Sequence, residues 1–220
     1  MHKPAEPVEY KNKIPMKKTE VGGKIKLPEP SYTGNTSVEA ALSQRRSIRD
    51  YSGENSTLEE VSQLLWAAQG ITAPWGGRTA PSAGALYPLE LYVVVGDVEG
   101  IDKSVYKYSQ EEHELEKVKE GDIRAELADA AVGQECVSDA AIDIVFTAVY
   151  ERTTRKYGER GIRYVHMETG HAAQNVYLQA VSLDLGTVVI GAFMDDRVKE
   201  LVNAGEQENP LYILPVERKR

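Results

Sequence analysis

The stretch IRYVHMETGHAAQNVYLQAVSLDL, residues 162–185, is the longest periodic segment of the chain and decides its fold. Apolar or small side chains recur every three or four residues and so share one face of an α-helix: Val165, Thr169, Ala172, Val176, Ala180 and Leu183. At 1.5 Å per residue such a helix is roughly 35 Å long and spans a whole small domain. Because Gly170 and Ala172 allow another helix to approach closely, we expect either the central core helix or the seam of a dimer.

The segments around this helix predict an alternation of shorter helices and strands. Thr36 with Glu39, and Ser56 with Glu59, have the capping-box spacing and predict two helix starts, the second helix ending at Gly70. Apolar runs predict strands, and further periodic segments predict helices at 123–131 and 196–202; the strands are 89–95, 105–108, 115–118, 141–149, 187–191 and 211–214. With no internal repeat, this mixture indicates an α+β or α/β domain.

Composition predicts one globular domain preceded by an arm. The 220 residues are 41% hydrophobic and 27% charged, which is the range of globular proteins. Residues 1–30 hold seven lysines, four glutamates and half of the ten prolines, which gives 7 − 4 = +3 charges. We therefore expect an extended basic, proline-rich arm over 1–30 and the folded domain over 31–220.

Charge and cysteine content disfavour several classes of protein. The net charge of −8 would repel a phosphate backbone, so nucleic acid is not expected as a partner. No segment approaches the roughly 20 apolar residues of a membrane span, and no secretory signal is seen, so we expect a cytoplasmic protein. The single cysteine, Cys136, excludes an intrachain disulfide framework and is expected to be an inert thiol.

Two segments are candidates for ligand binding. Residues 45–49 place three guanidinium groups and a hydroxyl within five residues, and arginine binds phosphate oxygens bidentately. A solvated helix end is the alternative, since cations there favour the helix dipole. Residues 72–88 form a long loop whose part 78–88 presents small side chains before a strand, but it matches neither a Walker A loop nor a GxGxxG turn.

A metal site is rejected on geometry. His166 and His171 are five residues apart, which places them about 140° apart around a helix, so they cannot bind one zinc ion with Glu168. Lys156 and Tyr157, just before the long helix, supply an amine and a phenol that can transfer protons. A solvated helix end is again the alternative for this pair.

Four motifs in order resemble the FMN-dependent nitroreductase superfamily, and within it the SagB-type dehydrogenase group that includes azoline-oxidising enzymes. The resemblance runs from about Ser37 to Val216. The motifs are Arg45-Arg46-Ser47-Ile48-Arg49-Asp50-Tyr51, Pro81-Ser82-Ala83-Gly84-Ala85-Leu86-Tyr87-Pro88-Leu89-Glu90, Gly170-His171-Ala172-Ala173-Gln174-Asn175, and Val189-Ile190-Gly191-Ala192-Phe193 followed by Leu214-Pro215-Val216. The resemblance implies a central mixed sheet flanked by helices, in an intertwined homodimer with the long helix at the interface.

The resemblance also implies an FMN site. In similar proteins the Arg45 position grips the phosphate, Arg46 and Ser47 lie along the phosphate and pyrimidine ring, and Arg49 reaches N1 and O2 of the isoalloxazine. The remaining implied cofactor contacts are Pro81, Ser82, Ala83 and Gly84 from the partner subunit, Ile190 and Gly191, whose backbone N–H faces N5, and Arg218 as a second phosphate cation.

The implied activity is hydride transfer by ping-pong between a donor, expected to be NAD(P)H, and a small oxidised acceptor such as a nitro compound or quinone. Lys156 and Tyr157 resemble the Lys-Tyr pair that azoline oxidases use to remove a proton, so substrate desaturation is the alternative. A flavin-storage or flavin-sensing protein without turnover is a third hypothesis.

Overall fold

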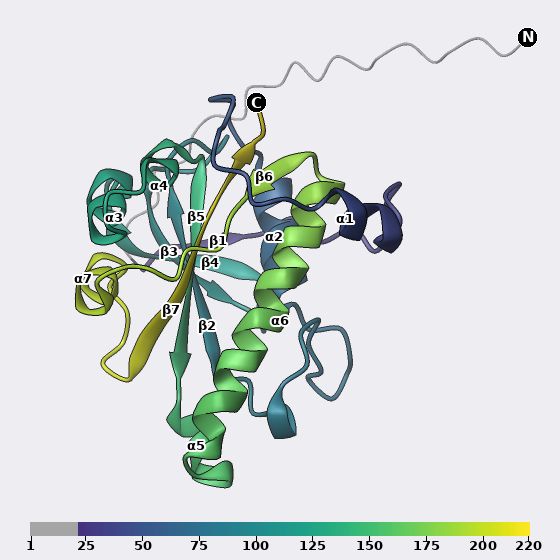
Figure 1. Cartoon of the computed structure of the whole chain (residues 1–220), viewed down its shortest axis with the longest axis vertical. Helices are drawn as coiled ribbons and strands as arrows, with labels where there is room; N and C mark the ends of the chain where they lie inside the picture. Colours follow the sequence, from purple (N-terminus) through teal and green to yellow (C-terminus); the bar gives the residue numbers. More distant parts are fainter. Residues whose placement is uncertain (1–21) are drawn as a thin grey trace, which may run out of the picture.

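A seven-stranded sheet forms the centre of the molecule in the computed structural model, which describes residues 22–220 (Figure 1). The strand order is β1-β4-β3-β2-β5-β7-β6. The strands are β1 Lys24–Lys26, β2 Leu89–Val95, β3 Ser104–Ser109, β4 Glu114–Glu120, β5 Ile142–Val149, β6 Leu185–Thr187 and β7 Glu208–Arg218. Neighbouring strands are antiparallel at all six pairings, so the α+β class is confirmed but the expected mixed sheet is wrong. The connection from β5 through the longest helix leads to β6 at the sheet edge, and β7, which is antiparallel to both, lies between β5 and β6, so the two form no parallel pair.

Helices cover both faces of this sheet. They are α1 Val38–Gln44, α2 Leu58–Gln69, α3 Arg124–Ala130, α4 Glu135–Asp139, α5 Glu151–Tyr157, α6 Arg160–Ser182 and α7 Asp195–Leu201, with a 3₁₀ turn η1 at Ala83–Ala85. Apolar residues of α2 and α6 pack with one face of the sheet, and those of α3, α4 and α7 pack with the other. Successive β2 residues alternate between the two cores, which explains the continuous apolar run that predicted this strand.

The long helix α6 is a core helix of its own chain. Its predicted face is buried, with Leu183 partly buried just beyond the helix end. Ala172 is 0% exposed, so the small residues of this face let α6 approach the sheet and α2, and Ala172 does not form a seam with a second copy. The opposite face is exposed and includes Met167 and His171.

The two predicted helix starts are each displaced by one residue. Ser37 caps α1 by accepting a hydrogen bond from Ala40 N at 3.1 Å, and Thr57 forms the capping box of α2 with Glu60. Ser56 is instead buried, where its backbone pairs with that of Val98. Adjacent hydroxyl residues have equal capping potential in the sequence, so packing decides between them.

The C-terminal part of the expected arm belongs to the folded domain. Residues 1–21 lie outside the described residues, but Lys24–Lys26 forms strand β1, which pairs with β4. Leu27 follows and is buried in the core. The prediction that residues 1–30 lie outside the core is therefore wrong for Leu27, and Ile25 packs against the core, because a three-residue edge strand has too short a pattern to be recognised.

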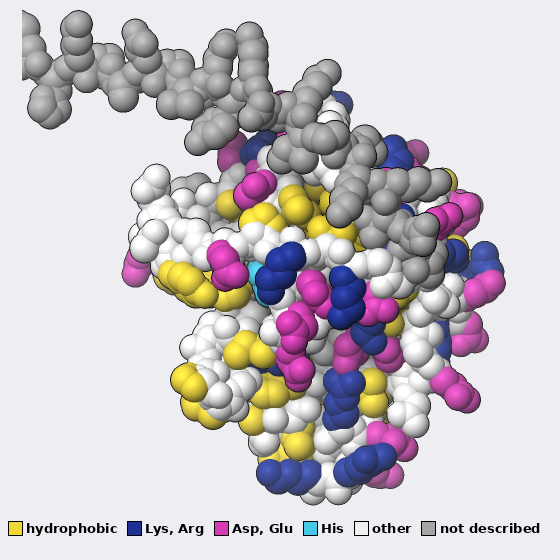
Figure 2. All heavy atoms as spheres, turned by 180° about the vertical axis from the view of Figure 1, so that it is seen from behind, with side chains coloured by type: hydrophobic (Ala, Val, Ile, Leu, Met, Phe, Trp, Pro, Cys, Tyr) yellow, Lys and Arg dark blue, Asp and Glu magenta, His cyan; other side chains and the backbone are white. Residues whose placement is uncertain are grey.

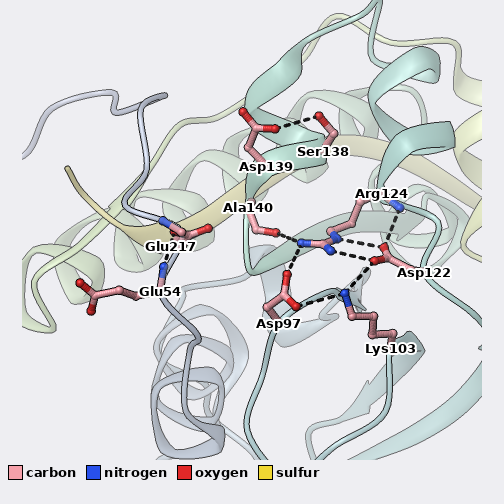
Figure 3. A network of polar contacts seen from close by, with 10 residues as sticks. Glu54, Asp97, Lys103, Asp122, Arg124, Ser138, Asp139, Ala140 and Glu217 are labelled. Carbon is pink, nitrogen blue, oxygen red and sulfur yellow. Dashed lines mark hydrogen bonds and ion pairs between the residues drawn. The ribbon is translucent and has the colours of Figure 1, made fainter.

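A polar network holds the second face of the sheet together (Figure 3). The Arg124 guanidinium bonds Asp122 at 2.7 Å, Asp97 at 2.9 Å and the Ala140 carbonyl at 2.7 Å. Hydrogen bonding by Arg124 lowers the pKa of Asp122 to about 2. The network ties the start of α3 to the segments next to β2 and β5.

Glu217 of β7 fixes the chain that follows the arginine-rich segment. Its carboxylate accepts hydrogen bonds from the backbone N–H groups of Gly53 and Glu54 (Figure 3). The Tyr51 hydroxyl donates to the Pro215 carbonyl at 3.3 Å, also in β7. Residues 45–49 are thus followed by a segment that is anchored to the sheet.

The surface opposite to the view of Figure 1 mixes charges of both signs. Figure 2 shows basic and acidic side chains interspersed on this face, with apolar side chains between them. Among the described residues, no helix is long and apolar enough to cross a membrane.

Candidate functional site

The arginine-rich segment lies between the end of α1 and strand β6. Arg45 is the C-terminal cap of α1, and the backbone N–H of Ile48 donates to the Thr187 carbonyl at 2.9 Å. Arg45 is half-buried, and Arg46 and Arg49 are exposed. Within residues 22–220 none of these three guanidinium groups forms an ion pair with a carboxylate. Three positive charges that have no carboxylate partner in the described part of this acidic chain make the segment an anion-binding candidate.

Tyr177 of α6 joins this segment to the fourth motif. The Arg45 guanidinium lies 5.1 Å from the centre of the Tyr177 ring, and the Tyr177 hydroxyl is 3.2 Å from Ser47 Oγ. The same hydroxyl accepts a hydrogen bond from Val189 N at 2.8 Å. Sequence reasoning missed Tyr177; its place beside the buried stripe of a predicted helix was the only available signal.

The segment at Gly191 is accessible from outside. Ile190 is buried and exchanges backbone hydrogen bonds with Ile213 at 2.8 and 3.0 Å. Gly191 is exposed, and a Cβ there would meet nothing closer than the Tyr212 ring at 3.7 Å. The backbone of Gly191 is therefore held in place by its neighbour while remaining open to a ligand.

Arg218 is engaged within the chain. Its guanidinium pairs with Glu60 and donates to the Leu183 carbonyl at 3.2 Å, with Glu54 at 3.7 Å. Its charge is thus balanced by carboxylates, unlike that of Arg45. The expected phosphate contact of Arg218 stays a prediction.

The loop containing Pro81, Ser82, Ala83 and Gly84 has an unusual backbone. Gly84 has φ +66°, and the non-glycine residues Ala85 and Tyr87 have φ +53° and +45°. Left-handed conformations of non-glycine residues cost free energy and are concentrated at functional sites. The Ser82 hydroxyl accepts a hydrogen bond from Tyr87 N at 2.9 Å and closes this turn.

Lys156 and Tyr157 meet this loop at Gly84. A Cβ at Gly84 would lie 2.7 Å from the Tyr157 hydroxyl oxygen and 2.9 Å from Lys156 Nζ. Both residues belong to the last turn of α5, a helix that was not predicted from the sequence. The structure thus brings together two predicted groups that are about seventy residues apart in the sequence.

Arg152 holds α5 and the loop together. From the first turn of α5 its guanidinium donates to the Tyr87 carbonyl at 3.1 Å and pairs with Glu90 of β2 at 2.5 Å. The ends of the strained turn are thereby fixed against the helix that carries Lys156 and Tyr157.

The loop and the arginine-rich segment lie on different sides of α6. Glu168 lies beside Ser82, whereas Tyr177 contacts Arg45 and Ser47. Glu168 and Tyr177 are nine positions apart, which places them about 14 Å apart along the helix axis and on opposite sides of it. One chain therefore presents the predicted cofactor contacts as two separate groups.

The buried side chains of Glu168 and Gln69 and the half-buried side chain of Arg78 form a polar cluster next to the loop. Burial raises the pKa of Glu168 to about 7, although hydrogen bonding by Ser82 and the charge of Arg78 oppose the rise. The other members of the rejected metal triad are placed separately: His166 hydrogen bonds with the Tyr150 hydroxyl at 2.6 Å, and His171 is exposed.

The fold and sequence define the class of this protein: residues 42–216 match the model of the nitroreductase family, and the chain belongs to that family. It is therefore oxidoreductase-like, in a family that generally binds flavin. MJ1384 of Methanocaldococcus jannaschii, provisionally named a nitroreductase, is 50% identical over 182 residues, 83% of this chain and 91% of the relative.

Solved structures show the same fold. A protein of Ralstonia eutropha, provisionally described as a nitroreductase, superimposes with a TM-score of 0.79 and 29% identity over 99% of each chain. A chain of the Escherichia coli microcin synthetase McbBCD complex gives 0.71 with 25% identity over 100% of this chain and 85% of its own. The azoline oxidase-like relatives include the trifolitoxin-processing protein TfxB and the microcin B17-processing protein McbC, of which this chain spans 30% and 50%.

Proposed function

We propose that this protein is an FMN-dependent oxidoreductase that transfers hydride by ping-pong between NAD(P)H and a small oxidised acceptor such as a nitro compound or quinone. The observation that carries the proposal is a group of three arginines that have no carboxylate partner within residues 22–220 and lie in the segment that Tyr177 joins to Val189, two residues before the exposed Gly191. FMN, when bound, supplies a hydride acceptor and donor at its N5 atom.

The residues present fit the chemistry of FMN. Arg45 is held in place by the Tyr177 ring and is suited to bind the phosphate, with Arg46 and Ser47 beside it. In this proposal Arg49 neutralises charge at N1 and O2, and the Gly191 N–H faces N5. Gly191 fits this role because a side chain is absent and the backbone is exposed.

The proposal requires a homodimer. The Pro81–Gly84 loop and Arg45 lie on different sides of α6, so the loop that completes a flavin site comes from a second copy. Lys156 and Tyr157 contact Gly84 and would enter that site with the loop. The exposed face of α6 carries Ile162 and Met167, which are 43% and 51% exposed and suit an interface.

Desaturation of a substrate is the second candidate function. It is supported by the contact of Lys156 and Tyr157 with Gly84, since removal of a C–H or N–H hydrogen pair needs a proton acceptor as well as a hydride acceptor. Similarity to a chain of the McbBCD microcin synthetase complex supports the same candidate.

A visible spectrum and an anaerobic titration test the proposal. The purified protein should be yellow with one FMN per subunit, and NADH or NADPH should bleach it in the absence of oxygen. Addition of a quinone or nitro compound should then restore the oxidised spectrum in repeated cycles. Bound FMN that no nicotinamide donor reduces would contradict the reductase proposal, and a colourless protein that does not bind added FMN would contradict the cofactor assignment.

A further inference from the structure

A buried polar cluster behind the Pro81–Gly84 loop has unused hydrogen-bonding capacity. Arg78 Nη1 donates to Gln69 Oε1 at 2.8 Å, and the Arg78 guanidinium stacks on the Tyr87 ring at 4.5 Å. Three buried atoms of the cluster have no hydrogen-bond partner in the described residues: Arg78 Nε, Gln69 Nε2 and Glu168 Oε1. Unpaired buried polar atoms are costly, and their accumulation at one place calls for a functional reason.

Ser82 connects this cluster to the loop surface. Its hydroxyl oxygen accepts the Tyr87 N–H, so the hydroxyl proton is free to be donated to the Glu168 carboxylate. Ser82 is half-buried, whereas Glu168 is 2% exposed. The hydroxyl therefore lies between the buried acid and the loop that carries Gly84.

We infer that Glu168 and Ser82 form a proton relay that delivers a proton to the acceptor bound at the Pro81–Gly84 loop. This inference rests on the proposed function, in which the acceptor gains a hydride at one atom. The Ser82 hydroxyl gives its proton to the neighbouring heteroatom of the acceptor, forming an O–H or N–H bond. The Glu168 O–H bond breaks and its proton replaces the one lost by Ser82. The resulting carboxylate then regains a proton from water, so that the acceptor has gained two electrons and two hydrogens.

The surroundings of Glu168 allow both of its protonation states. Burial disfavours the carboxylate, and the positive charge of Arg78 and the Ser82 hydroxyl favour it, which leaves its pKa near 7. Two further charges act on Arg78 in opposite directions: Glu90 raises the pKa of Arg78 and Arg152 lowers it. Such balance is a property of groups that both release and regain a proton near neutral pH.

The loop is approached by two groups that can transfer protons, the relay and the pair Lys156 and Tyr157. Lys156 and Tyr157 contact Gly84, and Glu168 lies beside Ser82, so the two groups approach the same loop at different residues. The relay gives reduction a proton source that does not depend on Lys156 or Tyr157.

Three variants of the FMN-loaded enzyme test the relay. Glu168→Gln should lower kcat for reduction of a quinone at least tenfold, leave KM within about twofold, and remove the limb of the pH profile near 7. Ser82→Ala should lower kcat similarly, and Ser82→Thr, which keeps the hydroxyl, should restore most of it. Unchanged kcat and pH profile in both Glu168→Gln and Ser82→Ala would overturn the relay.

An infrared pH titration of the carboxyl stretch gives a readout besides turnover. The wild-type protein should show a buried carboxyl that titrates near pH 7, absent in Glu168→Gln and retained in Ser82→Ala. Asp143→Asn is the matched control, because Asp143 is the fully buried carboxyl on β5 whose pKa burial also raises. Loss of the band near pH 7 in Asp143→Asn but not in Glu168→Gln would overturn the assignment. Because this titration needs no electron donor, a wild-type enzyme that no donor reduces would count against the proposed function and not against the titrating acid.

Discussion

The hydroxyl oxygen of Tyr157 lies against the backbone of Gly84, only 2.7 Å from where a Cβ would be. Lys156 Nζ lies 2.9 Å from the same position. Real Cβ contacts are essentially never so short, so a side chain at position 84 would push the ends of Tyr157 and Lys156 aside, and the positive φ of Gly84 also favours glycine there. The packing of α5 against the loop thus brings the backbone of Gly84 into contact with the side chains of Lys156 and Tyr157.

Replacing Gly84 tests this coupling. Gly84→Ala should displace Lys156 and Tyr157, and we expect any desaturating turnover to fall at least tenfold, while reduction stays within a few-fold and the protein stays folded. The matched control is Gly133→Ala, which has φ +73° with no atom within 4 Å and so carries the same backbone strain without the contact. Steady-state kinetics and thermal unfolding of both variants provide the measurement. Equal losses of turnover in the two variants would show that strain alone is responsible.

Arg45 should discriminate FMN from riboflavin. Arg45→Ala is expected to weaken FMN binding by roughly 10- to 100-fold, since a charge-assisted hydrogen bond contributes about 1.5–3 kcal/mol, and to leave riboflavin binding almost unchanged. Flavin fluorescence titration measures both affinities. Arg197→Ala controls for net charge, because Arg197 is an exposed residue of α7 that pairs with Glu200. An equal loss of both flavins would mean that Arg45 does not bind the phosphate.

A variant without the Lys156 and Tyr157 functional groups distinguishes the two proposed activities, reduction and desaturation. The double variant Lys156→Ala with Tyr157→Phe should keep bound FMN and nicotinamide-driven reduction within a few-fold, because the relay of Glu168 and Ser82 supplies that proton. Any desaturating activity should disappear, since a positioned base supplies about 10²- to 10⁴-fold in rate. Parallel assays of both reactions check this. A steep loss of reduction with unchanged FMN would assign the pair to reduction itself.

A substitution at Met167 tests dimer formation, whereas a substitution at Ala172 does not. Substitution of Ala172 by arginine would unfold the chain, because Ala172 is wholly buried in its own core. Met167→Glu places a charge on the exposed face of α6 and should shift light scattering toward the monomer and weaken FMN binding together. Val132→Glu, at an exposed apolar residue after α3, is the control and should stay dimeric. A monomeric wild-type protein that keeps FMN and activity would contradict the shared site.

The sequence by itself determined the elements whose signal is local and repeated. The period of α6 identified its buried face, and the continuous apolar runs of β2 and β5 identified strands covered on both faces. The arginine-rich segment was also recognisable, because it is a cluster within five consecutive residues.

The tertiary structure decided which of these segments meet. Four features depend on contacts between residues that are distant in the sequence. They are the pairing of edge strand β1 with β4, the contact of Tyr177 with Arg45 and Ser47, the position of Tyr157 at Gly84, and the burial of Glu168 behind Ser82. A periodic pattern states which side of an element is apolar, but it carries no information about the partner across a packed interface. That partner is fixed only when the sheet order and the packing of α5 and α6 are set, because the free energy of burial depends on the whole core and not on one segment.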